Sequence, residues 1–174
     1  MPAAAPASTS APTFSFVLEY PAADPGASTA HYLAKLSVET DPADVQDDLS
    51  RGSDRFVLLD ARDADAYTAC HLPGAMSLPH RTISRQAVAE LPRDKVLVVY
   101  CWGPACNAGT KACAKLSELG FRVKEMIGGI EYWRHEGLQV EGTLETAVLE
   151  LPGLPASFWP NPCKRRQLAR LSQN

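Results

Sequence analysis

The stretch Val96-Leu-Val-Val-Tyr-Cys-Trp-Gly-Pro-Ala-Cys-Asn107 decides the fold. Its first five residues are apolar on both faces, which is typical of a parallel strand that helices cover on either side. Cys101 follows this strand directly, and the residues after it turn the chain toward a helix that starts near Asn107. Open α/β sheets bind ligands at the carboxyl ends of their strands. The sequence therefore predicts a functional cysteine at this edge of a sheet.

Two further runs have the length and composition of strands. They are Phe56-Val-Leu-Leu-Asp60 and Arg122-Val-Lys-Glu-Met-Ile127, and the stretches between the three runs have helical patterning. A strand, a helix and a second strand in sequence indicate parallel pairing through right-handed crossovers. The predicted fold class is α/β, with a central parallel sheet flanked by helices on both faces.

The helix after the cysteine loop has the clearest boundaries in the sequence. Asn107 is expected to cap its start and Gly120 to end it in a left-handed turn. A cysteine beside a helix start ionises more readily, because the helix places partial positive charge there. The apolar stripe of this helix consists of Ala108, Ala112, Leu116 and Leu119.

The loop itself is expected to form a concave anion site from its backbone N–H groups. Pro104 has no N–H, so the site has one donor fewer than a loop without proline. The N–H groups counted as donors belong to Trp102, Gly103, Ala105, Cys106 and Asn107.

Composition divides the chain into three parts. Residues 1–30 are rich in Ala, Ser and Pro, and we expect a flexible arm in which the run 14–20 forms one docking strand. Residues 31–142 form the predicted domain, with a weakly helical segment over 31–40 and a helix that begins at Asp41-Pro42 and ends at about Ser50.

Residues 143–174 are a Pro-rich and basic C-terminal extension. It carries Phe158 and Trp159, which are costly to leave in water. We expect them to pack on the domain or across a homodimer contact that the terminal extensions form.

Composition also limits the classes of function. The net charge of −3 provides no global field that would hold nucleic acid or an anionic membrane. Five cysteines are an odd number, and together with the histidines they show no zinc spacing, so we expect neither a disulfide scaffold nor a metal or other cofactor. The chain shows no secretory signal and no apolar stretch that would span a bilayer, which predicts a cytoplasmic protein.

Four segments in the right order resemble the rhodanese-like sulfurtransferase family. Residues 56–62 are similar to the family's strand that ends in Asp-Val-Arg, and residues 71–75 to its His-Ile-Pro-Gly-Ala segment. Tyr100-Cys101 matches the strand end with the catalytic cysteine, and residues 128–133 match its Gly-Gly and Trp signature. The resemblance covers most of residues 41–142 and implies a rhodanese-like fold.

The resemblance implies that Cys101 carries a transferred sulfur as a persulfide and that residues 102–107 bind the sulfur donor. Loops of this family often carry a cation that meets an anionic donor, whereas this loop has none, so we expect organic persulfides or polysulfide to be better donors than thiosulfate. Trp102 either lines the pocket mouth, which we favour, or covers the sheet edge. Asp60 is expected to orient the loop from beneath, and Arg62 to pair with Asp63 or Asp65.

Cys106 departs from the family pattern. One hypothesis is that it attacks the outer or inner sulfur of a Cys101 persulfide, or closes a disulfide with Cys101 under oxidation. The alternative is that it only fills space in the loop. Cys113 is expected in the core, and Cys70 and Cys163 have no supporting constellation.

The leading predicted function is a sulfurtransferase that takes sulfur from a small-molecule donor and gives it to a thiol, cyanide or protein acceptor. The alternative is a catalytically weak rhodanese-like module for protein interaction or redox sensing. A cysteine phosphatase of the related fold ranks last, because its loop requires an arginine where this chain has Asn107.

Overall fold

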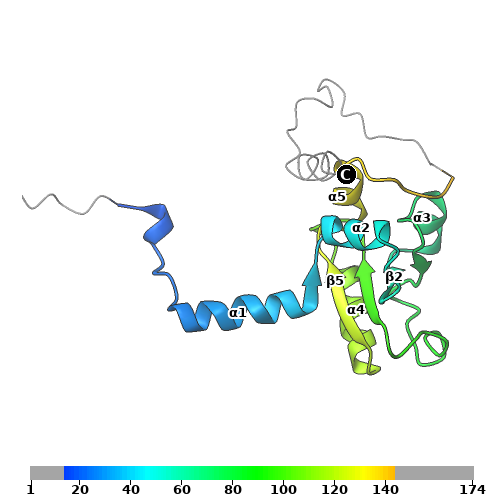
Figure 1. Cartoon of the computed structure of the whole chain (residues 1–174), viewed down its shortest axis with the longest axis horizontal. Coiled ribbons are helices and arrows are strands. Elements are labelled where there is room, and N and C mark those ends of the chain that lie inside the picture. The colour runs from blue at the N-terminus through cyan, green and yellow to red at the C-terminus, as the bar shows by residue number, and fades with distance from the viewer. Residues whose placement is uncertain (1–13, 144–174) are drawn as a thin grey trace, which may run out of the picture. The chain divides into compact units, whose positions relative to one another are not determined.

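The computed structural model describes residues 14–143, and their core is a five-stranded sheet in which every pair of neighbours is parallel (Figure 1). The strand order is β1-β5-β4-β2-β3, which puts β4 at the centre. The predicted α/β class and parallel sheet are therefore confirmed. The strands are β1 (Glu39–Thr40), β2 (Phe56–Asp60), β3 (Met76–Ser77), β4 (Val96–Tyr100) and β5 (Arg122–Met126).

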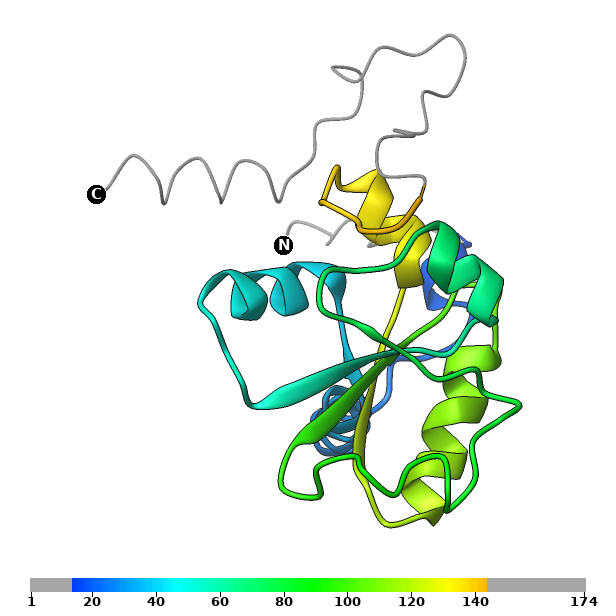
Figure 2. The same ribbon diagram turned by 90° about the vertical axis from the view of Figure 1, so that its right-hand side faces the viewer.

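Helices cover both faces of the sheet, as the sequence predicts. The side chains of β4 alternate between two core clusters: Val98 and Tyr100 belong to one, and Leu97 and Val99 to the other. The first cluster contains residues of α2 (Pro42–Ser50) and α5 (Gly129–His135), and the second contains residues of α4 (Ala108–Glu118). Figure 2 shows α2 and α4 on opposite sides of the strands.

Two edge strands were not predicted. β1 and β3 have two residues each, too few for an alternating pattern to show in the sequence. The three longer strands lie together in the middle of the sheet, with β5 and β2 on the outside. The outer edges of β5 and β2 offer free backbone groups, and β1 pairs with β5 and β3 with β2, both in parallel. The third predicted strand is one residue shorter than expected and ends at Met126.

The helix starts show which sequence signals were correct. Asp41 caps α2, with its carboxylate accepting a hydrogen bond from the N–H of Asp44 at 2.8 Å, as its position before Pro42 predicts. The remaining helix of the sheet region, α3 (Ala64–Ala69), is capped in the same way by Asp63. The C-terminus of α4 is followed by Gly120 with φ of +84°, which confirms the left-handed turn.

The expected docking strand at residues 14–20 is wrong. These residues contain a short 3-10 helix, η1 (Phe16–Leu18), closed by a hydrogen bond of 3.2 Å from the N–H of Leu18 to the carbonyl of Ser15. An alternating pattern does not produce a strand where no neighbouring strand satisfies its backbone groups, and the described residues provide none here.

The weakly helical segment is a full helix, α1 (Pro25–Val38), and it begins earlier than expected. Asp24 accounts for the earlier start, because its carboxylate accepts hydrogen bonds from the N–H groups of Gly26 and Ala27. The chain divides into two compact units between Ala34 and Lys35. The predicted boundaries at residues 30 and 142 remain predictions.

The C-terminal extension, with Phe158, Trp159 and the basic residues after them, lies outside the described residues, so its predicted packing is open. None of the helices within residues 14–143 combines the length and hydropathy that crossing a bilayer requires.

Candidate active site

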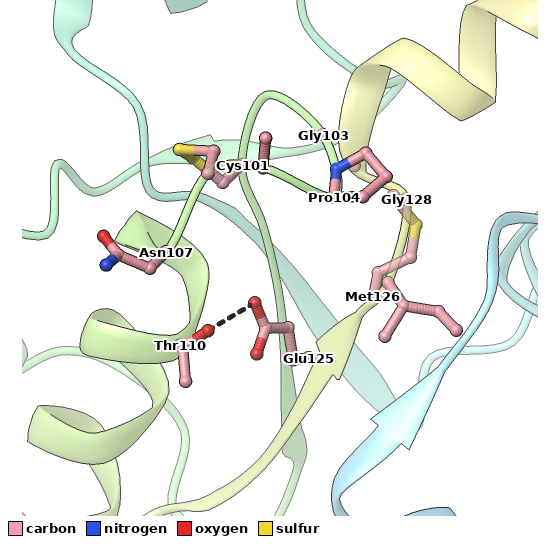
Figure 3. A pocket seen from close by; sticks show the side chains of 12 residues that line it. Cys101, Gly103, Pro104, Asn107, Thr110, Glu125, Met126 and Gly128 are labelled. Carbon is pink, nitrogen blue, oxygen red and sulfur yellow. Dashed lines mark hydrogen bonds between the residues drawn. A yellow bond between two sulfur atoms is a disulfide. The ribbon is translucent and has the colours of Figure 1, made fainter.

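A cavity of about 320 Å³ lies at the carboxyl edge of the sheet, where the sequence predicts a site (Figure 3). Cys101 enters it from the end of the central strand β4. Residues 103–107 of the loop, Thr110 of α4 and residues 125–129 complete its lining. The structure thus brings the loop, the start of α4 and the end of β5 around one cysteine.

Cys101 is only 4% exposed, and its sulfur is bonded to the sulfur of Cys106. The Cα atoms of the two residues are 6.5 Å apart. Cys106 is half-buried and lines the same cavity. Of the two cysteines of the loop, Cys106 is therefore the one that solvent reaches more easily.

A tight turn shapes the loop between the two cysteines. The N–H of Cys106 donates to the carbonyl of Gly103 at 3.0 Å, which closes a four-residue turn with Pro104 in its second position. The expectation that Cys106 contributes its N–H to the anion site is therefore wrong, because that N–H is used inside the turn. Of the predicted N–H donors, those of Trp102, Gly103, Ala105 and Asn107 remain.

Helix α5 holds the carbonyl groups at the start of the loop. The N–H of Ile130 donates to the carbonyl of Cys101 at 3.0 Å, and the N–H of Glu131 donates to the carbonyl of Trp102 at 2.9 Å. A trans peptide points its N–H opposite to its carbonyl. The N–H groups of Trp102 and Gly103 therefore point away from α5, and α5 does not prevent them from donating hydrogen bonds to an anion.

Two glycines allow α5 to approach the loop this closely. Gly128 and Gly129 have φ of +83° and +59°, a conformation that side chains disfavour. A β-carbon on Gly129 would lie 2.5 Å from the carbonyl oxygen of Cys101 and 2.7 Å from that of Trp102. The Gly-Gly signature is thus the condition for backbone contact between α5 and the loop.

Asn107 occupies the capping position of α4 but does not cap it with its side chain. Its ψ of 11° is not extended, whereas a capping side chain needs an extended residue to reach the helix N–H groups. The expected side-chain cap is therefore wrong, and Asn107 lines the cavity instead.

Glu125 is a site residue that the sequence analysis missed. It lies on β5 beside Val99 of β4, and its side chain points toward the loop while accepting a hydrogen bond of 3.1 Å from the Thr110 hydroxyl (Figure 3). Burial raises the pKa of Glu125, the hydrogen bond from Thr110 opposes this, and the negative charge of Glu39 adds to it. A signal existed in the sequence: Glu125 shares a strand face with the partly buried Val123.

Gly109 lies between Glu125 and Cys101. A β-carbon on Gly109 would lie 2.6 Å from a carboxylate oxygen of Glu125 and 3.5 Å from the β-carbon of Cys101. Both side chains therefore meet the same small space at the start of α4. Among the described residues that line the cavity, Glu125 is the one charged side chain, and no Lys or Arg joins it there.

The sequence matches a known family. A family model described as the rhodanese-like domain matches residues 41–136, which is more than half of the chain. This chain belongs to the rhodanese-like family.

Similar proteins include sulfurtransferases and longer proteins. BH2092 of Bacillus halodurans, a solved structure, has a TM-score of 0.69 and 46% identity, and the match covers 83% of this chain and 99% of that one. Thiosulfate sulfurtransferase GlpE of Pseudomonas savastanoi is 37% identical over 79 residues, which are 45% of this chain and 72% of GlpE. An HTH-type transcriptional regulator of Mycobacterium tuberculosis is 33% identical over 91 residues, 52% of this chain. The match spans only 40% of the regulator's length.

The supporting residues of this rhodanese-like domain form a buried ion pair beneath the loop. Asp60 and Arg62 are 0% and 3% exposed, and an Nη2–Oδ2 hydrogen bond of 2.6 Å and an Nε–Oδ1 hydrogen bond of 3.0 Å join them. The expected pairing of Arg62 with Asp63 or Asp65 is wrong, because only Asp60 is buried with it. Burial would lower the pKa of Arg62, but the hydrogen bonds and charge of Asp60 outweigh burial and raise it.

Arg62 links this ion pair to the loop. Its guanidinium also donates to the carbonyl of Cys70 and lies 4.5 Å from the ring centre of Trp102. Trp102 is 49% exposed, and its favoured place at the pocket mouth stays a prediction. The cation at its ring attracts the indole and fixes its position beside Arg62. Asp60 thus positions the loop through Arg62.

The remaining described cysteines lie outside the cavity. Cys70 is buried in one core cluster, and Cys113 packs against the other, as predicted for Cys113. Burial raises the pKa of Cys113 to about 12, and the charge of Glu125 contributes. Between residues 14 and 143, the structure has no cluster of His, Cys, Asp or Glu that would hold a metal ion. Cys163 is outside the described residues.

We expect Gly129→Ala to destabilise the protein more than Gly52→Ala. Gly52 has φ of +69°, and a β-carbon added there would have no atom within 4 Å, so its substitution costs only the backbone conformation, about 1–2 kcal/mol. Gly129→Ala adds a collision with two carbonyl oxygens of the loop. Urea unfolding measures both losses. Equal losses in the two variants would contradict the close contact between α5 and the loop.

We expect Asp60→Asn to lower the free energy of unfolding by about 3–5 kcal/mol, because it leaves a buried arginine without a counter-charge. The matched control is Asp63→Asn, since asparagine caps a helix as well as aspartate does, and this change should stay within about 0.5 kcal/mol. Denaturant unfolding compares the two. A small loss in Asp60→Asn would show that the ion pair does not hold the loop.

Proposed function

We propose that this protein is a sulfurtransferase that accepts a sulfane sulfur on Cys101 and holds it as a persulfide. The position of Cys101 carries the proposal: the residue directly follows the central strand, lines a cavity and precedes the start of α4. Membership of a family that includes sulfurtransferases supports it. So does a loop whose N–H groups are left for an anion by the contacts with α5.

The first step is a nucleophilic displacement on a donor with a sulfur–sulfur bond. The thiolate of Cys101 attacks the outer sulfur of the donor, a new sulfur–sulfur bond forms, and the rest of the donor leaves with the electron pair of the broken bond. The partial positive charge at the start of α4 and the N–H groups of the loop stabilise the anionic sulfur before and after transfer. The second step gives the outer sulfur to a thiol acceptor.

The charges around the cavity favour donors other than thiosulfate. A dianion would approach the carboxylate of Glu125 without meeting a Lys or Arg among the described lining residues. Two like unit charges about 4 Å apart repel by about 1 kcal/mol even in water, which changes a rate roughly fivefold. An ionised organic persulfide group carries one negative charge where thiosulfate carries two, so organic persulfides are the donor class that we propose.

A redox-sensing module is the second candidate. The bond between Cys101 and Cys106 favours it, because a cysteine pair in one loop responds to oxidants without any sulfur transfer. The similarity to part of a transcriptional regulator is consistent with a domain that reports to another protein. The cytoplasmic location and the homodimer expected from the sequence stay predictions.

Reduced Cys106→Ser protein, which lacks the second thiol of the loop, should gain the mass of one sulfur atom from cysteine persulfide, and with cyanide added it should form thiocyanate faster than the protein-free mixture. Cys101→Ser should gain no sulfur and should form thiocyanate no faster than the protein-free mixture, because the nucleophile is absent. Protein mass spectrometry and a thiocyanate assay make these measurements, with thiosulfate as the second donor. A Cys106→Ser protein that gains no sulfur from any donor would favour the redox-sensing module.

Glu125→Gln should raise kcat/KM for thiosulfate by roughly fivefold or more, because it removes the repelling charge. The value for cysteine persulfide should change less. Glu118→Gln is the control, since it removes a carboxylate from the far end of α4, away from the cavity. Thiosulfate ranking above cysteine persulfide in the wild type, or no gain in Glu125→Gln, would contradict the electrostatic argument.

A further inference from the structure

Cys106 shares the cavity with the proposed nucleophile and is bonded to it. The Cα–Cα distance of 6.5 Å lies within the range of about 4.4–6.8 Å that protein disulfides span. The sulfur of Cys106 therefore reaches the inner sulfur of Cys101 from the backbone positions that the loop occupies.

The surrounding hydrogen bonds keep both cysteines in these positions. The turn from Gly103 to Cys106 brings Cys106 back toward the strand end, and α5 holds the carbonyl of Cys101. These hydrogen bonds therefore keep the two sulfurs within bonding reach of one another.

We propose that Cys106 resolves the Cys101 persulfide and releases its outer sulfur as sulfide, so that the protein reduces sulfane sulfur at the expense of a dithiol. This inference rests on the proposed function, because it needs the persulfide as its starting point. It adds hydrogen sulfide as a product and a dithiol as the electron donor to the transfer reaction.

The resolving step balances without an external oxidant. The thiolate of Cys106 attacks the inner sulfur of the persulfide, the bond between Cys101 and the outer sulfur breaks, and the outer sulfur leaves as HS⁻ with the electron pair. The sulfane sulfur is reduced by two electrons, and the two cysteines are oxidised to the disulfide found in the structure. Attack on the outer sulfur would only move the persulfide to Cys106.

The difference in exposure between the two cysteines suits a reset by a dithiol. Cys101 is 4% exposed, whereas Cys106 is half-buried, so an external thiolate reaches the sulfur of Cys106 first. Its attack expels the thiolate of Cys101 into the loop, where the N–H groups and the start of α4 stabilise it. The second thiol of the reductant then frees Cys106, and the nucleophile is restored.

Other cysteines are poorly placed to do this. Cys70 is 7% exposed within a core cluster, and burial raises the pKa of Cys113 to about 12, which keeps it protonated. Of the cysteines that the structure describes, only Cys106 joins Cys101 in the cavity lining. Cys163 lies outside the described residues and is therefore tested as a control.

A single turnover without any dithiol tests the proposal, because a dithiol would itself release sulfide from a persulfide. Full-length protein is reduced, freed of reductant under anaerobic conditions, given one equivalent of cysteine persulfide and quickly desalted. Sulfide is measured in the reaction mixture before desalting, and protein mass after it, for the wild type, Cys106→Ser and Cys163→Ser, with Cys101→Ser as the blank.

The wild type and Cys163→Ser should release about one sulfide per protein above the blank and end two hydrogens lighter than the reduced protein. Cys106→Ser should hold one extra sulfur and release no more sulfide than the blank. A wild type that keeps its persulfide as long as Cys106→Ser does would overturn the resolving role and leave the transferase standing. If neither protein gains sulfur, the proposed function fails as well.

Discussion

The contact between α5 and the cysteine loop is the constraint on which the site depends. Two carbonyl groups of the loop accept hydrogen bonds from the N–H groups of Ile130 and Glu131, so the opposite sides of the same peptides carry N–H groups that α5 leaves free. Only glycine at position 129 permits this approach, since any β-carbon would collide with both carbonyl oxygens. The packing of α5 against the loop, about thirty residues away in the sequence, thereby decides which N–H groups of the loop are free to bind a ligand.

Two carboxylates flank the central strand and have opposite effects. Asp60 ends β2, is fully buried, and forms an ion pair with Arg62, which in turn lies under Trp102. Glu125 lies on β5 at the other side, faces the cavity, and has a hydrogen bond from Thr110 but no counter-ion among the described lining residues. The first is structural support for the loop. The second sets the charge that an incoming sulfur donor meets.

The sequence predicts the sheet and the position of the cysteine because the strand 96–100 is apolar on both faces and Cys101 directly follows it. Local patterns did not reveal which N–H groups stay free, because the turn that uses the N–H of Cys106 and the contacts from α5 are tertiary features. The same reason explains why the partner of Arg62 was predicted wrongly. Burial beside Asp60 selects this partner, and sequence neighbours do not reveal burial. At residues 14–20, alternation suggested a strand, but the described residues offer it no partner strand.

The central claim is that the loop N–H groups hold a sulfur carried by Cys101. A crystal structure of sulfur-loaded Cys106→Ser tests it most directly, since this variant should keep the persulfide. The account predicts an extra sulfur on Cys101 within hydrogen-bond distance of at least two N–H groups from Trp102, Gly103, Ala105 and Asn107. Loaded protein whose extra sulfur lies on another residue, or on Cys101 with these N–H groups pointing elsewhere, would contradict it.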